Sequence, residues 1–110
     1  MGNITVDELS IRVREFVESR KWKKYHNPKD IAIALSVEAS ELLEIFQWKN
    51  PEKNLSKEDL DRVRRETADV IIYALSIANA CEFDLGKAVV EKIVLNAEKY
   101  PVEESKDFFD

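Results

Sequence analysis

The chain has 110 residues, of which 45% are hydrophobic and 35% are charged, with a formal net charge of −5 and only two glycines. This length and composition suit one helical globular domain, so we expect residues 1–110 to form a single domain. The negative charge argues against a nucleic-acid polymer or an acidic membrane surface as a partner. A single cysteine, Cys81, excludes an intramolecular disulfide, and no long apolar segment is present. We therefore expect a cytoplasmic protein that does not enter a membrane.

Capping signals mark the starts of two helices in the first half of the chain. Thr5 followed by Glu8 is a capping box, and it predicts a helix from there to about residue 21. Pro28 directly after Asn27 is typical of the first helical position behind an N-cap, and it predicts a second helix to about Trp48. The apolar side expected for the first helix consists of Leu9, Val13, Phe16 and Val17.

Two further helices are expected in the second half. Ser56 with Asp59 starts a helix that should continue to about Cys81, and Asp84 is a suitable N-cap for a last helix that Pro101 ends. Residues 102–110 should be loosely held. The apolar residues expected to pack from the last helix are Leu85, Ala88, Val89, Val90, Ile93 and Val94. Because no strand alternation is present, the predicted fold class is all-α, with four helices and short connections.

Acidic residues interrupt the apolar faces of the second and third helices. At 100° per residue, one face of the second helix consists of Ile31, Ala34, Leu35, Glu38, Glu41, Leu42 and Ile45. The third helix repeats the pattern, since Glu66 and Asp69 share a face with its apolar residues. Each acidic pair is spaced i, i+3, so its two carboxylates lie side by side.

Four carboxylates would converge if these two helices pack antiparallel, and such a group needs a counter-charge. Carboxylates out of water are costly unless they are paired, hydrogen-bonded or bound to metal. Hard divalent cations prefer oxygen ligands, so the sequence predicts a Mg²⁺ site, with Mn²⁺ as a possible substitute ion. A nearby acid, Glu44, lies off this face and should be solvated.

The spacing of the acids resembles a known family. Glu38-x-x-Glu41, a gap of 24 residues and Glu66-x-x-Asp69 are similar to the signature of the all-α nucleoside triphosphate pyrophosphohydrolases of the MazG type. The resemblance runs from about residue 5 to residue 101 and is greatest to the short, single-domain branch that includes the dCTP pyrophosphatases. The supporting stretches are Trp22…His26-Asn27-Pro28, Phe46-Gln47-Trp48, Asp69-Val-Ile-Ile-Tyr73 and Lys92-x-x-x-Asn96-x-x-Lys99-Tyr100-Pro101.

The resemblance implies a four-helix MazG-like bundle assembled as a dimer or a dimer of dimers. It also implies Mg²⁺-dependent hydrolysis of a nucleoside triphosphate, dCTP or a modified relative first, to the monophosphate and pyrophosphate. Glu38, Glu41, Glu66 and Asp69 would hold the metal, and Glu41 would also orient or deprotonate the attacking water. The chain departs from the animal enzymes at Val13, where a histidine would be expected, and this leaves the base preference open.

Residues for the substrate itself are expected on several elements. Lys92, Asn96 and Lys99 share one helical face and could hold phosphates, or could simply form a solvated stripe. Aromatic faces stack on nucleobases but are equally common in protein cores. The remaining candidates for the base and the sugar are Trp22, His26, Trp48 and Tyr73.

Two other interpretations use the same acids differently. In a non-enzymatic helical interaction module, the acids would form salt bridges with Arg62, Arg64, Arg65 and the lysines. A di-iron carboxylate bundle would need Glu-x-x-His on two helices. The single histidine, His26, does not follow a glutamate at that spacing, which excludes a di-iron site.

Overall fold

The computed structural model describes residues 2–20, 27–49 and 55–102, and these residues contain four α-helices and no strand. The helices are α1 (Val6–Ser19), α2 (Pro28–Phe46), α3 (Lys57–Ala80) and α4 (Leu85–Lys99). This arrangement confirms the predicted all-α class. No helix in the described part of the chain is both long enough and apolar enough to cross a lipid bilayer.

Each helix begins at the capping residue that the sequence indicates. Backbone N–H groups donate to the side-chain oxygens of the four N-caps, over 3.1 Å at Thr5, 2.9 Å at Asn27, 3.1 Å at Ser56 and 2.9 Å at Asp84. These bonds satisfy donors that the first helical turn otherwise leaves without a partner. The helix boundaries are therefore fixed by local chemistry. The expected tail lies almost entirely outside the described residues.

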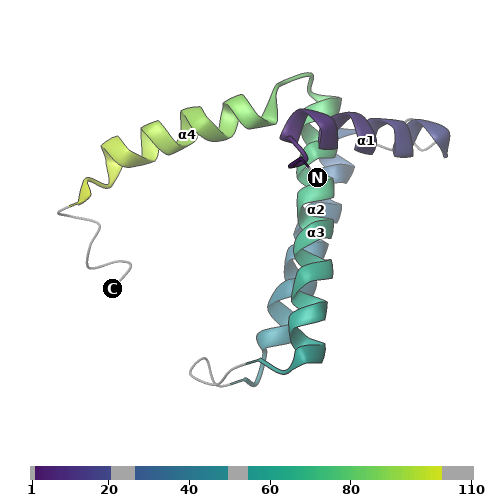
Figure 1. The fold of residues 1–110 in the computed structure, drawn as a ribbon, viewed down its shortest axis with the longest axis vertical. Coiled ribbons are helices and arrows are strands. Elements are labelled where there is room, and N and C mark those ends of the chain that lie inside the picture. The colour runs from purple at the N-terminus through teal and green to yellow at the C-terminus, as the bar shows by residue number, and fades with distance from the viewer. Residues whose placement is uncertain (1, 21–26, 50–54, 103–110) are drawn as a thin grey trace.

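The core of the molecule is a hairpin in which α2 and α3 lie side by side and antiparallel (Figure 1). The most deeply buried apolar side chains of the hairpin are Ile31 and Ile45 from α2 and Leu75 and Ala78 from α3. A salt bridge joins the ends of the two helices next to their connection, since Lys49 Nζ lies 2.8 Å from Asp59 Oδ2. This packing sets the acidic pairs of α2 and α3 against each other.

The other two helices lie at the opposite end of the hairpin from this connection. There α1 crosses α3 and buries Val13, and the first turn of α4 lies next to Val6 of α1 (Figure 1). The rest of α4 leads away from the hairpin, and this helix contains no buried residue. The expectation that its apolar side packs within the chain is therefore wrong for Val89, Val90, Ile93 and Val94, which are about half exposed or more. Within residues 2–20, 27–49 and 55–102, no other element covers this side of α4.

Candidate functional site

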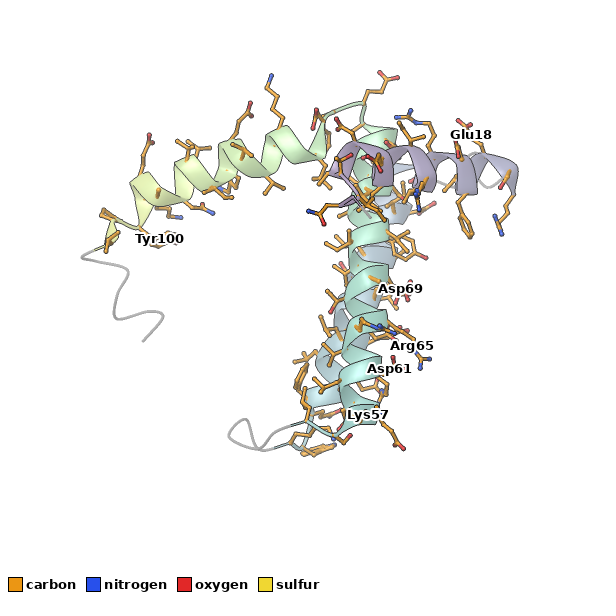
Figure 2. All side chains as sticks on the ribbon, in the orientation of Figure 1. Glu18, Lys57, Asp61, Arg65, Asp69 and Tyr100 are labelled. Carbon is orange, nitrogen blue, oxygen red and sulfur yellow. The ribbon has the colours of Figure 1, made fainter. Side chains whose placement is uncertain are left out.

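Three of the four predicted acids meet at the α2–α3 interface. Glu38 of α2 and Glu66 and Asp69 of α3 each offer a carboxylate oxygen, and these oxygens all lie within 4.8 Å of one another. All three side chains are half-buried. Figure 2 shows Asp69 on the side of α3 that also carries Asp61 and Arg65. Because the helices run antiparallel, the middle of α2 lies level with the middle of α3, which brings the two acidic pairs together.

The crowding of these acids changes how two of them titrate. Burial, reinforced by the neighbouring carboxyl of Glu41, raises the pKa of Glu38 from 4.5 to about 7. Burial and Glu41 also raise the pKa of Glu66, and the charge of Asp69 adds to the effect on both. Both causes disfavour the ionised form, because a carboxylate loses hydration and meets like charge. The cluster therefore carries electrostatic strain that a cation would relieve.

The oxygens of the cluster fit a divalent metal ion. Oε2 of Glu38 and Oε2 of Glu66 are buried and have no hydrogen-bond partner in the described structure. Buried polar atoms are nearly always satisfied, so two unpartnered oxygens in a cluster of carboxylates indicate a ligand. The donor set is made only of carboxylates, which suits Mg²⁺ or Mn²⁺ rather than a metal that prefers nitrogen or sulfur.

The basic residues of α3 form their salt bridges outside the acid cluster. Arg64 and Arg65 both form salt bridges with Asp61, two turns before Asp69 along α3. Within residues 2–20, 27–49 and 55–102, no lysine or arginine forms an ion pair with an acid of the cluster. This observation weighs against the interaction-module interpretation, which requires such pairs.

Glu41 differs from the other three predicted ligands. Its side chain is exposed rather than facing the core, and its carboxylate does not belong to the group of three oxygens. It still lies close enough to Glu38 and Glu66 to raise the pKa of each. Glu41 therefore lies at the exposed edge of the acid cluster, and its role as a metal ligand stays a prediction. Glu44 is exposed, as predicted.

The pKa of Glu38 leads to a prediction about stability. A carboxyl whose folded pKa is raised to about 7 stabilises the fold most fully below its ordinary pKa of 4.5, and this contribution is lost as the pH rises towards 7. We expect the urea concentration at the unfolding midpoint of the metal-free wild type to fall between pH 4.5 and 7. The midpoint of Glu38→Gln should fall less, because glutamine has no proton to lose in this range. Parallel urea midpoints for the two proteins from pH 4.5 to 8 would contradict a raised pKa.

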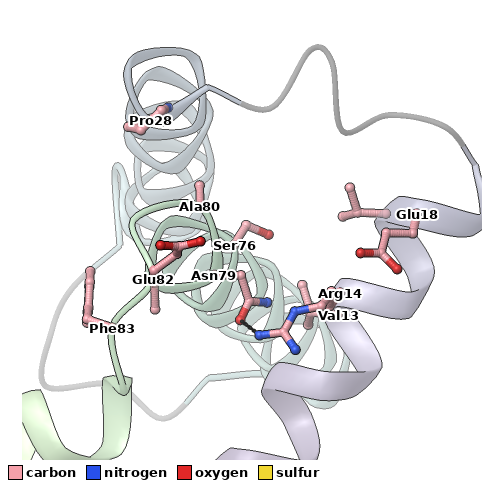
Figure 3. Close-up of a pocket in the computed structure, with 11 residues that line it drawn as sticks. Val13, Arg14, Glu18, Pro28, Ser76, Asn79, Ala80, Glu82 and Phe83 are labelled. Atoms are coloured by element: carbon pink, nitrogen blue, oxygen red, sulfur yellow. Dashed lines mark hydrogen bonds between the residues drawn. The ribbon is translucent and has the colours of Figure 1, made fainter.

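A cavity of about 550 Å³ lies at the end of the hairpin where α1 crosses α3 (Figure 3). Side chains from the second half of α1, the start of α2 and the end of α3 line it, together with Glu82 and Phe83 just after α3. Val13 and Ser76 are buried at this junction, and Ser76 donates to the carbonyl oxygen of Ile72 over 2.9 Å. Arg14 and Asn79 supply polar groups to the cavity, and the guanidinium of Arg14 donates a hydrogen bond to the side-chain oxygen of Asn79. The cavity is mixed in polarity, as small-molecule sites are.

The predicted substrate residues are spread over the molecule. Tyr73 is half-buried one turn beyond Asp69, between the acid cluster and the cavity. Trp48 is 93% exposed just after α2, at the other end of the hairpin, with a left-handed φ of 69°. Trp22 and His26 lie outside the described residues.

Three candidate phosphate ligands lie on α4. Lys92, Asn96 and Lys99 are all exposed, on the helix that leads away from the acid cluster. The chain does not bring them to the acids in this conformation. Sequence reasoning placed them on one helical face, which remains correct, but it could not place the helix.

Sequence reasoning missed the polar residues of the cavity. Ser76 follows Tyr73 by three residues on the face of Asp69, so its spacing was a usable signal. Arg14 and Asn79 carried no such signal, because they lie 65 residues apart and meet only through the crossing of α1 and α3.

Comparisons with known proteins agree with this architecture. The model of the MazG-like family matches residues 33–108. A crystal structure of a pyrophosphatase from Archaeoglobus fulgidus superposes with a TM-score of 0.72 at 39% identity, covering 92% of this chain and 96% of that one.

Two curated proteins of animals are also similar. dCTP pyrophosphatase 1 of Rattus norvegicus is 35% identical over 107 residues, which are 93% of this chain and 62% of the rat protein. The Homo sapiens protein of the same name is 33% identical over 101 residues, covering 88% of this chain and 59% of the human one. The chain thus spans about three fifths of the length of these relatives.

Proposed function

Since the chain belongs to the MazG-like family, we propose that it hydrolyses a nucleoside triphosphate to the nucleoside monophosphate and pyrophosphate. The observation that carries the proposal is the half-buried cluster of Glu38, Glu66 and Asp69, with two buried oxygens that lack partners. The names of the similar proteins point to the same reaction, with dCTP or a modified relative as the first substrate to test. The proposed unit is the single domain of residues 1–110, acting in the cytoplasm.

The residues divide into two roles. Glu38, Glu66 and Asp69 would hold Mg²⁺, which when bound supplies positive charge against the phosphates and the carboxylates. Glu41 is exposed beside them and is the candidate that orients the water and takes its proton. The water oxygen forms a bond to the α-phosphorus, the bond from that phosphorus to the bridging oxygen breaks, and pyrophosphate leaves with the bridging oxygen.

The order of the acids, Tyr73 and the cavity along α3 supports one orientation of the bound nucleotide. Tyr73 lies one turn from Asp69 towards the cavity, so a triphosphate at the acids would place its sugar near Tyr73 and its base towards α1. Trp22 and His26 belong to the connection between α1 and α2 and are proposed to line the base as well. The ring of Tyr73 would crowd a 2′-hydroxyl.

Self-association would complete the site. The apolar side of α4, made of Val89, Val90, Ile93 and Val94, is uncovered in the single chain. Burial of this side against further copies, in a dimer or a dimer of dimers, would stabilise the fold and change the surroundings of Lys92, Asn96 and Lys99. In that assembly these three residues are proposed to hold phosphates, and the exposed Trp48 is proposed to stack on a base.

A screen of nucleoside triphosphates tests the reaction. We expect dCTP with Mg²⁺ to give dCMP and pyrophosphate, and CTP to react about 10- to 200-fold less efficiently, the range that steric exclusion of one group gives. Phosphorus NMR identifies the products, and Glu38→Gln serves as the control for contaminating activity. Release of orthophosphate would refute the reaction class, and equal efficiency for the two sugars would refute the role of Tyr73.

A further inference from the structure

One face of α3 leads from the acid cluster into the cavity. Asp69, Tyr73, Ser76 and Ala80 are spaced by four, three and four residues, so they lie along one side of the helix. With a rise of about 1.5 Å per residue, Ser76 lies about 10 Å beyond Asp69 along the helix axis. This separation is close to the reach of a nucleoside from its α-phosphate to its base. The cavity is therefore at the right distance to receive the base.

At the cavity, two hydrogen bonds between α1 and α3 hold Arg14 in place. Its Nη2 donates to Oδ1 of Asn79 over 3.1 Å, drawn as the dashed line in Figure 3. Nδ2 of the same asparagine donates to the carbonyl oxygen of Ser10 over 3.0 Å. Asn79 thus uses both ends of its amide to fix the guanidinium relative to the two helices.

The guanidinium of Arg14 has further N–H donors besides the one that binds Asn79. A guanidinium has five N–H donors and no acceptor, and the bond to Asn79 engages only one donor group. Glu18 lies one turn further along α1 and lines the same cavity, yet among the described residues no carboxylate forms a salt bridge with Arg14. The cavity thus contains an oriented cation that is not neutralised by an ion pair.

We propose that Arg14 determines base specificity by donating a hydrogen bond to a carbonyl oxygen of the base, and that Asn79 is its positioning residue. The inference rests on the proposed function, because it assumes that a nucleotide binds with its phosphates at the acid cluster. Cytosine has such a carbonyl oxygen and adenine has none, so Arg14 should favour dCTP over dATP. An arginine contact to a base edge fixes both distance and direction, which gives discrimination.

The test compares Arg14→Met with Arg12→Met. Methionine keeps much of the aliphatic length and removes every donor, and Arg12 is an exposed arginine of the same helix that does not line the cavity. We expect the ratio of kcat/KM for dCTP over dATP to fall about tenfold in Arg14→Met, mostly through a higher KM for dCTP. The ratio should not change in Arg12→Met. Asn79→Ala should lower it in the same direction by a smaller factor.

Calorimetric titration with dCMP gives a readout that does not depend on hydrolysis. Arg14→Met should bind dCMP about tenfold more weakly than the wild type, with dAMP affected little. An unchanged base ratio combined with a lower melting temperature would show that Arg14 only ties α1 to α3, and would overturn the inference. If no triphosphate is hydrolysed, the proposed function fails, while the dCMP titrations still decide whether Arg14 recognises the base.

Discussion

Replacing Glu38 by Gln or Asp69 by Asn is expected to abolish Mg²⁺-dependent hydrolysis of dCTP, with a loss of about 10³-fold or more. Each change removes a negative charge and an oxygen ligand from the cluster while keeping the shape of the side chain. The metal-free variants should remain helical and melt at the same or a higher temperature than the wild type, because fewer like charges meet in a half-buried site.

Glu44→Gln is the matched control for these variants. It makes the same chemical change on the same helix, but Glu44 is exposed and lies off the cluster. Pyrophosphate release at saturating dCTP, titrations with Mg²⁺ and thermal melts should be compared across the set. Near-normal activity of Glu38→Gln or Asp69→Asn would refute the metal site, and loss of helicity would assign the defect to folding.

The helices of the chain were predictable because their boundaries depend on local chemistry. Thr5, Asn27, Ser56 and Asp84 each accept a backbone hydrogen bond at the start of a helix, as the sequence indicates. The resemblance to MazG-type proteins is confirmed by the family match and by the Archaeoglobus fulgidus structure. Caps and family signatures are read within short stretches, so one sequence is enough for both.

The site was predictable only as far as helical periodicity reaches. Periodicity placed Glu38, Glu66 and Asp69 on facing sides of α2 and α3, and the structure brings these three residues together. It gave Glu41 the same orientation, and the structure places Glu41 next to these acids but at the exposed edge of the cluster. The contact of Arg14 with Asn79 depends on the crossing of two helices, which no local pattern encodes.

The direction of α4 was not predictable for a related reason. The apolar pattern of α4 is the same as that of a helix buried within its own chain. This pattern does not indicate whether the surface that covers the helix belongs to the same chain or to another. In the single chain, the first turn of α4 contacts α1 and the rest extends outwards (Figure 1). Ile93 is 61% exposed and Val90 is 62% exposed. A second copy of the chain is the simplest cover for such a surface.

Replacing Ile93 by Asp is therefore expected to break the proposed assembly and to abolish activity with it. A charge left without a partner in an apolar interface costs about 3–5 kcal/mol, which weakens association roughly 10²- to 10⁴-fold. Sedimentation should show the wild type as a dimer or tetramer and Ile93→Asp as a monomer at the same concentration. Hydrolysis of dCTP should fall together with assembly, because Lys92, Asn96 and Lys99 lie on the same helix, and α4 leads away from the hairpin that contains the acids.

The control for this change is Glu91→Lys, which alters charge more strongly on a part of α4 turned away from the apolar side. It should leave both sedimentation and activity close to wild type. A monomeric wild type with full activity would refute self-association and would mean that α4 has no role in phosphate binding. An Ile93→Asp monomer that keeps its activity would support self-association through α4. It would refute phosphate binding by α4 of another copy, because the acid cluster would then work without it.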